Sequence, residues 1–283
     1  MKHTPIAALW AAAGIFTQAA QATSATSATP ADEPLWELGL GAGALRLPHY
    51  RGSDQSRTWL LPIPYFVYRG EIFRADREGA HARLVDSQRV DVDISIDAST
   101  PARSNDNRAR AGLPDLAPTV EVGPNLNLHL AQGPRWKLDL RLPARAVFTV
   151  GSHPQAIGWR TSPSINLDVD VAGWDVALQG GPVAANRQYH GYFYDVAPAY
   201  ATASRAAYAA PGGAAGWTFT AGASRRVGNF WLGSYLQADS LNGAVFNASP
   251  LVKQRQNLSF GVGMSWIFAV SETRVAARPA VGP

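Results

Sequence analysis

Two histidines have sequence neighbours that could support hydrolytic chemistry. His49 precedes Ser53 and Asp54, and His190 precedes Asp195. A histidine beside a serine or a carboxylate is the arrangement that activates a hydroxyl or a water molecule as a nucleophile. Both groups fall in segments rich in polar residues, where such neighbours arise by chance. We therefore interpret them as turn and loop residues, and we predict no catalytic site.

The sequence also lacks the usual signals for cofactors. It contains no cysteine, which excludes disulfides and thiolate zinc sites. Segment 39–43 (GLGAG) resembles half of a dinucleotide-binding motif, but it lies inside a predicted strand. Its glycines are expected to let that strand bend or to admit a bulky neighbour. With no phosphate-binding loop, zinc spacing or calcium loop, we predict no metal, no nucleotide cofactor and no nucleic-acid partner.

The strongest pattern in the chain is an alternation of polar and apolar residues with period two. It is clearest in segments 90–98 and 136–146. Successive side chains of a strand point to opposite faces, so each segment has one apolar and one charged face. The charged faces carry Asp91, Asp93, Asp97, Glu121, His129, Lys137, Asp139, Arg141, Arg145, Asp168 and Asp170. The pattern fits a secreted sandwich, or a membrane barrel whose lumen is either a water-filled pore or packed with ion pairs.

About twelve segments are predicted to be strands. They are 36–47, 59–68, 71–85, 90–99, 119–131, 136–147, 162–171, 174–180, 196–203, 216–226, 230–239 and 258–268. Many have about ten residues, the length that a tilted strand needs to cross the hydrocarbon layer. Short connections alternate with longer ones at 100–118, 151–161 and 181–195, as in outer-membrane barrels. No segment beyond the N-terminal apolar run shows helical periodicity.

Aromatic residues stand near the ends of the predicted strands. They are Trp36, Trp59, Tyr68, Trp136, Phe148, Trp174, Trp217, Phe230 and Phe268. Rings at strand ends form the girdles that meet the two membrane interfaces, whereas a soluble sandwich holds large rings mid-strand in its core. We therefore predict an all-β protein, a single antiparallel transmembrane β-barrel of about twelve strands.

The N-terminus has the three-part layout of a secretory signal peptide. A basic start is followed by the apolar segment 6–16 and by a small-x-small site at 20–22. We predict four regions: signal peptide 1–22, disordered leader 23–34, barrel 35–268 and C-terminal tail 269–283. Export to the outer membrane of a Gram-negative cell is expected. The net charge of +4 suits contact with an anionic surface such as lipopolysaccharide.

Five short motifs follow one another along the chain. They are 48–54 (PHYRGSD), 61–65 (LPIPY), 112–123 (GLPDLAPTVEVG), 192–196 (YFYDV) and 248–252 (ASPLV). In this order they resemble the MipA/OmpV family of outer-membrane proteins. The chain departs from the usual barrel pattern in one respect. Its last strand-end aromatic, Phe268, is followed by a tail instead of ending the chain.

The resemblance implies a role in the cell envelope. The family's namesake is a scaffold that holds a murein-cleaving lytic transglycosylase beside a murein-synthesising penicillin-binding protein. We therefore expect a non-enzymatic scaffold, with outer-membrane lipid, lipopolysaccharide and these two enzymes as partners. A passive or weakly selective pore for small solutes is the alternative that the charged strand faces allow. A barrel hydrolase is a third class, for which no catalytic group stands out.

Two loops are candidate contact surfaces. In segment 48–54, Tyr50 and Arg51 could form an exposed patch, but we favour an architectural turn with Gly52 at positive φ and Ser53 or Asp54 bonding the backbone. Loop 101–118 is our candidate for contact with a partner or lipopolysaccharide, because loops carry function more often than strands do. Its charged residues are Arg103, Asp106, Arg108, Arg110 and Asp115.

Overall fold

The computed structural model describes residues 33–69, 73–76, 79–86 and 89–275. The predicted signal peptide, all but the last two residues of the predicted leader, and the end of the tail lie outside the described residues. The elements are β1 (Glu33–Pro34), β2 (Trp36–Pro48), β3 (Ser56–Arg69), β4 (Phe73–Asp76), β5 (Gly79–Asp86), β6 (Val90–Ser99), η1 (Ser104–Asp106), β7 (Thr119–Gly133), β8 (Trp136–Thr149), β9 (Ala156–Thr161), β10 (Ser164–Val171), β11 (Trp174–Ala185), α2 (Arg187–Tyr194), η2 (Pro198–Tyr200), β12 (Gly213–Val227), β13 (Phe230–Ser240), β14 (Gln256–Val270) and β15 (Arg274–Val275).

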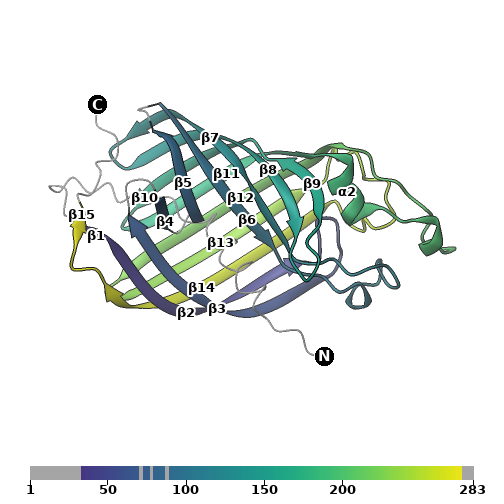
Figure 1. Cartoon of the computed structure of the whole chain (residues 1–283), viewed down its shortest axis with the longest axis horizontal. Helices are drawn as coiled ribbons and strands as arrows, with labels where there is room; N and C mark the ends of the chain where they lie inside the picture. The colour runs from purple at the N-terminus through teal and green to yellow at the C-terminus, as the bar shows by residue number, and fades with distance from the viewer. Residues whose placement is uncertain (1–32, 70–72, 77–78, 87–88, 276–283) are drawn as a thin grey trace.

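One antiparallel sheet of thirteen strands, β2 to β14, closes on itself to form the barrel (Figure 1). Both β8 and β11 pair with β9 and with β10, so β9 and β10 are successive halves of one barrel strand. That strand is interrupted at Ser162 and Pro163, because proline has no N–H to donate to a ladder. The thirteen strands therefore fill twelve positions around the barrel, and the predicted all-β barrel of about twelve strands is confirmed.

Strand β14 shows how the alternation builds the wall. Its outward residues are about half exposed: Leu258, Phe260, Val262, Met264, Trp266 and Phe268. Between them, Ser259 and Ser265 are buried in the barrel. An outward apolar band with small or polar residues inside is what a lipid-facing strand requires. The same outward exposure holds for Trp136, Trp174, Trp217 and Phe230, as the girdle prediction requires.

The two ends of the barrel differ. At one end β7 and β8, β10 and β11, and β12 and β13 are joined by two-residue turns, and β1 pairs with β15. At the other end lie long loops, including the one that carries α2 (Figure 1). In outer-membrane barrels the short turns face the periplasm and the long loops face the exterior. We call these two ends the turn end and the loop end.

Several local predictions are wrong. Segment 71–85 holds two short strands, β4 and β5, instead of one long strand. Segment 196–203 contains no barrel strand but the single 3-10 turn η2, which begins at Pro198, where a missing N–H costs nothing. Strand β9 and helix α2 lie in predicted loops. Helix α2 has only eight residues, too few to show a periodicity, and its N-cap is the Asn186 side chain, which accepts from the Tyr189 amide at 3.0 Å.

The predicted girdle also contains one error. Trp59 packs inside the barrel against the apolar cluster around Leu45. Strand β3 is apolar on both faces, so its sequence does not show which face meets lipid. No helix of the described residues is long and apolar enough to span a membrane.

Candidate functional site in the lumen and its loop cap

One side of the lumen is a wall of paired charges on β6 to β10. The part of this wall nearest the loop end contains the ion pairs of Arg145 and Arg160, and we call it the upper belt. In it, Arg160 Nη1 lies 3.0 Å from Glu121 Oε1. Arg145 Nη1 lies 3.6 Å from Asp97 Oδ2 and 3.9 Å from Glu121 Oε2. Its Nε donates to Ser95 Oγ at 2.9 Å. Buried charges need such partners, because desolvation is costly for an isolated ion.

The charged wall continues towards the turn end. The carboxylate of Asp139 lies 2.8 Å from His129 Nδ1 and 3.0 Å from Lys137 Nζ. The charged strand faces predicted from the sequence therefore do point inward. His129–Asp139 and Arg145–Glu121 join neighbouring strands, Arg145–Asp97 and Arg160–Glu121 reach two strands away, and Lys137–Asp139 lies along β8, as expected for a lumen packed with ion pairs.

The opposite side of the lumen is apolar, which the alternation of polar and apolar residues does not predict. Its cluster comes from β2, β3, β13 and β14 and consists of Leu45, Leu61, Ile63, Tyr65, Val67, Trp231, Tyr235 and Ile267. Glycines make room for it. A Cβ atom at Gly261 would lie 2.5 Å from both Leu45 Cδ2 and Tyr235 Cε1. The glycine-rich segment 39–43 is part of this wall, where Gly39 faces Tyr65, so its structural interpretation is confirmed.

A cavity of about 530 Å³ remains between the two walls. Its lining runs from Lys137 near the turn end, past Glu121 and Arg160, to His190 and Phe246 in the loops. The lumen is therefore neither a wide pore nor fully packed.

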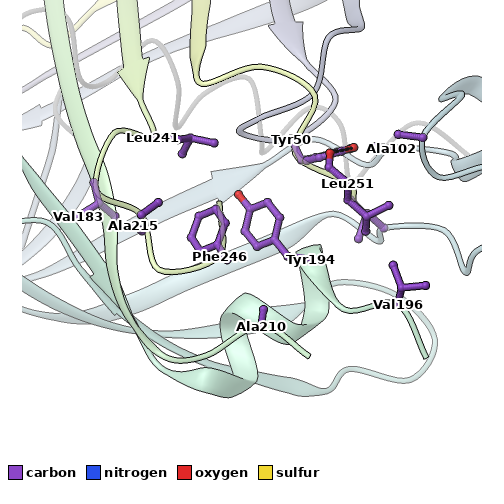
Figure 2. Close-up of a cluster of buried hydrophobic side chains, with 13 residues drawn as sticks. Tyr50, Ala102, Val183, Tyr194, Val196, Ala210, Ala215, Leu241, Phe246 and Leu251 are labelled. Carbon is purple, nitrogen blue, oxygen red and sulfur yellow. Dashed lines mark hydrogen bonds between the residues drawn. The ribbon is translucent and has the colours of Figure 1, made fainter. Parts of the chain in front are cut away.

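Four loops close the barrel over this cavity, and we call residues 49–55, 100–118, 186–212 and 241–255 the loop cap. Their shared core contains Tyr50, Tyr194, Val196, Leu241, Phe246 and Leu251 (Figure 2), together with Leu116. The rings of Tyr194 and Phe246 are stacked with centroids 3.8 Å apart. Each of the four loops contributes buried side chains to this one core, so the cap is a packed unit and not a set of separate loops.

Hydrogen bonds tie the loops of the cap to one another. Tyr50 Oη donates to the Leu251 carbonyl at 2.7 Å, and Tyr194 Oη donates to the Arg51 carbonyl at 2.9 Å. Ser249 Oγ donates to the Tyr194 carbonyl at 2.8 Å. Burial raises the pKa of both Tyr50 and Tyr194, so their hydroxyls stay protonated as donors.

The cap is also fastened to the barrel. Arg51 Nε lies 3.0 Å from Asp239 Oδ1 on β13. The Gly52 amide donates to Asn257 Oδ1 on β14 at 2.6 Å, and Asn257 Nδ2 donates to the Ser53 carbonyl at 2.8 Å. These contacts fix the first loop across the mouth of the lumen.

The turn at 48–54 is therefore architectural, as the favoured interpretation predicts. Tyr50 is buried, so it forms no exposed patch with Arg51. Gly52 has a φ of 95°, and Ser53 Oγ accepts from the Gln55 amide at 3.1 Å. Motif segments 112–116, 192–196 and 248–252 lie in the same cap, although they are far apart in the sequence.

Loop 101–118 divides into a buried and an exposed part. Arg110 is buried and donates to the carbonyls of Phe193 and Pro114 at 2.9 and 3.0 Å. Arg103 and Arg108 are exposed, and Arg108 pairs with Asp54 at 3.2 Å. The other two acids of the loop hold it in place: Asp106 lies 3.5 Å from Arg57, and Asp115 accepts from the Ser104 amide at 2.7 Å. The exposed charges of this loop are therefore Arg103, Asp106, Arg108 and Asp115, while Arg110 belongs to the interior of the cap.

The two histidines considered for hydrolysis have structural partners. His190 Nδ1 lies 2.7 Å from the Pro211 carbonyl, while Asp195 pairs with Arg187 at 2.7 Å. His49 Nδ1 lies 3.1 Å from Asn107 Nδ2. Burial lowers the pKa of both histidines, so both favour the neutral form.

Sequence reasoning missed important parts of this site. Arg160 lies in a predicted loop, although its place opposite Glu121 completes the upper belt. Phe246 lies between predicted strands, and only the apolar composition around it signals a core. Within the described ranges, no group of three or more histidines and carboxylates could hold a metal ion.

These features define an outer-membrane β-barrel. The antiparallel sheet is closed and has an outward apolar band, with short turns at one end and a cap of long loops at the other. The family model described as "MltA-interacting protein MipA" matches residues 40–268, and the chain belongs to this family. No curated protein matches the chain.

Solved structures of outer-membrane proteins are similar to the chain at low identity. An outer-membrane channel from Pseudomonas putida F1 is 14% identical, with 82% of this chain and 96% of that chain covered and a TM-score of 0.46. The NanC porin is 8% identical, with coverages of 81% and 98% and a TM-score of 0.38. The outer membrane phospholipase A from Escherichia coli is 10% identical, with coverages of 82% and 93% and a TM-score of 0.33.

Proposed function

We propose that this protein is a non-enzymatic scaffold in the outer membrane that binds murein-remodelling enzymes and does not conduct solutes freely. The loop cap is the observation that carries the proposal. A core shared by four loops, fastened to β13 and β14, obstructs the loop end of the lumen. When the lumen is obstructed at that end, the outer wall and the two ends of the barrel are the surfaces left for binding other proteins, which suits an interaction protein.

The partner class comes from the family. Its model is described as MltA-interacting, which supports a murein enzyme as a partner. The lytic transglycosylase and the penicillin-binding protein are the two enzymes that the family resemblance implies. Such enzymes act on murein in the periplasm, so they would meet the turn end. Exposed charges at this end include Arg135, whose side chain is 61% exposed and pairs with Asp170 at 3.4 Å. Export by a signal peptide cleaved after residue 22 and contact of the cap with lipopolysaccharide belong to the same proposal.

The absence of enzymatic activity is also part of the proposal. It is supported by the positions of the histidines, since His190 and His49 serve the packing of the cap and neither contacts the neighbouring acid considered from the sequence.

The test is recovery of partners after brief crosslinking and purification from outer membranes in mild detergent. We expect a lytic transglycosylase or a penicillin-binding protein with the wild type. Arg135→Glu at the turn end should reduce this recovery, whereas Arg108→Glu, at an exposed arginine of the cap, should not. Clean protein without either enzyme, or equal loss in both variants, would contradict the scaffold.

A pore remains the second candidate function, favoured by the 530 Å³ cavity that reaches from Lys137 to the cap. Planar-bilayer recordings separate the two functions. A scaffold with a closed cap gives no steady conductance. A steady open conductance that changes on reversal of the lumen residue Arg141 would establish the pore instead.

A further inference from the structure

The upper part of the lumen has the composition of a ligand site. Here the cavity is bounded by the cap residues His190 and Phe246, by Glu121 and Arg160 of the charged wall, and by Thr220 of β12, and we call this part the upper chamber. The whole cavity, at about 530 Å³, falls in the range of roughly 300–1,000 Å³ that small-molecule sites occupy. Neither the scaffold nor the pore uses the roof of this chamber.

His190 supplies an unused hydrogen-bond acceptor in that roof. A carbonyl oxygen only accepts, so the contact with the Pro211 carbonyl at 2.7 Å requires that Nδ1 carry the proton. Nε2 of the neutral ring is then an acceptor. The residue is fully buried, and this nitrogen has no hydrogen-bond partner within the residues that the structure describes. A buried polar atom of this kind favours a ligand that donates a hydrogen bond.

The charged wall adds both donors and acceptors to the chamber. Nε of Arg160 is buried without a hydrogen-bond partner in the described part of the chain. Oε2 of Glu121 is buried without a hydrogen bond as well, although Arg145 Nη1 lies 3.9 Å away. Other atoms of Arg160 and Glu121 form the 3.0 Å ion pair of the upper belt. A strongly charged ligand would have to compete with this pair. A neutral ligand with several hydroxyl groups can bond the remaining atoms and leave the pair intact.

The other surfaces of the chamber fit the same kind of ligand. Thr220 and Ser259 present hydroxyl groups on the side of β12 and β14, while the hydroxyl of Thr218 donates to Asp239. The roof contains the partly exposed ring of Phe193 beside the buried, stacked rings of Tyr194 and Phe246. Aromatic rings beside hydroxyls and a charged pair offer an apolar surface for C–H groups next to hydrogen-bonding groups for O–H groups.

We propose that the upper chamber binds a small neutral saccharide of one or two sugar units, with a sugar hydroxyl donating to Nε2 of His190 and others bonding Oε2 of Glu121 and Nε of Arg160. The sugar enters from the turn end, since the cavity lining extends to Lys137 there while the cap covers the loop end. This inference does not rest on the scaffold function.

The experiment is isothermal titration of the full-length protein in amine-oxide micelles, because maltoside detergents carry a sugar head group that would compete. Maltose, sucrose and cellobiose are titrated, with lysine, glutamate and inorganic phosphate as charged comparators. We expect at least one disaccharide to bind with a Kd of about 1 mM or tighter, and the charged compounds to bind more weakly or not at all.

Two variants test whether the saccharide binds in the upper chamber. His190→Phe removes the acceptor in the roof, and Thr220→Val removes one hydroxyl from the wall without changing its volume. Loss of one hydrogen bond predicts a Kd increase of up to about tenfold in each. His153→Phe is the matched control, since His153 is exposed outside the cavity lining, and should leave the Kd unchanged.

Heat-modifiable gel mobility confirms that each variant has folded, and Thr220→Val keeps the test valid if His190→Phe disturbs the cap. The proposal is overturned by any of three results. These are no saccharide binding at 10 mM, tighter binding of phosphate or an amino acid than of any saccharide, or an unchanged Kd in both variants.

Discussion

Nε of Arg51 lies 3.0 Å from Oδ1 of Asp239, which joins the first long loop to a barrel strand 188 residues later. The same carboxylate accepts from Thr218 Oγ1 at 2.6 Å and from Gln237 Nε2 at 2.9 Å. On the other side, the Arg51 carbonyl accepts the hydroxyl of Tyr194. Arg51 therefore connects the barrel wall, its own loop and helix α2, and the cap depends on this connection for its position over the lumen.

Asp239→Asn should loosen the cap. The Asp239 side chain is 2% exposed, so the lost charge partner is not replaced by solvent, and we expect a cost of about 1–3 kcal/mol. Trypsin cleavage at the exposed Arg103 and Arg108 in native conditions measures the opening of the cap. Asp54→Asn is the control, because its pair with Arg108 is exposed and worth about 0–1 kcal/mol. Equal cleavage rates in the two variants would show that Asp239 does not hold the cap.

Phe246→Ala should unfold the cap and spare the barrel. Phe246 is 1% exposed and stacks on Tyr194, so its truncation is expected to cost about 3–5 kcal/mol. Native-state proteolysis against urea gives the change in the free energy of cap opening, while heat-modifiable mobility reports the barrel. Phe219→Ala, at a lipid-facing ring, should leave cap proteolysis unchanged. A loss of barrel mobility in Phe246→Ala would mean that cap and barrel fold as one unit.

Alanine substitutions at two glycines of the cap distinguish the cost of backbone strain from the cost of a steric clash. Gly52 and Gly112 both have positive φ, of 95° and 79°. A Cβ at Gly52 would also lie 2.9 Å from Leu241 Cδ1, whereas none of the surrounding atoms comes within 4 Å of a Cβ at Gly112. Gly112→Ala should therefore cost about 1–2 kcal/mol through backbone strain alone, and Gly52→Ala should cost more. The same proteolysis assay measures both, and an equal cost would rule out the contact with Leu241.

Acidification should weaken the cap. Burial lowers the pKa of His190 in the folded cap below its usual 6.5, and Arg51 and Arg187 act in the same direction. Above pH 6.5 the ring is neutral in both the closed and the open cap. As the pH falls below 6.5, the open cap takes up the proton first, so the closed cap loses stability until the folded pKa is reached.

Cleavage of the cap by a protease active from pH 4.5 to 7.5 measures this loss. His190→Phe should reduce the pH dependence, and what remains is assigned to His49, whose pKa is lowered by burial too. An identical pH dependence in wild type and His190→Phe would exclude His190 as the cause.

Much of the barrel can be predicted from the sequence because its information is local. The alternation in β8 or β14 shows the two faces without knowledge of any other strand. The phase of β3 is ambiguous because both of its faces are apolar, so the prediction puts Trp59 on the wrong side of the barrel wall. Pro163 interrupts the strand that β9 and β10 form together, so the sequence does not show that they share one position in the barrel.

The site is much less predictable because it depends on distant contacts. Tyr50 and Leu251 are 201 residues apart, and their hydrogen bond has no trace in either segment alone. The motifs at 48–54, 112–116, 192–196 and 248–252 carry the family resemblance, but only the fold shows that they form one core. The burial of His190 Nε2 cannot be predicted from the sequence either, because it depends on the packing of α2 and not on the residues next to His190 in the chain.

The pairing of β2 with β14 has a consequence for the biogenesis of this protein. Glu37 in the first long strand is a partner of Val270 in the last, so the ring closes only when nearly the whole chain is present. Until then both strands have open edges, which pair readily with other chains. The exported polypeptide must therefore be kept from aggregating during its passage to the membrane, and a truncation before β14 should leave an insoluble chain instead of a smaller barrel.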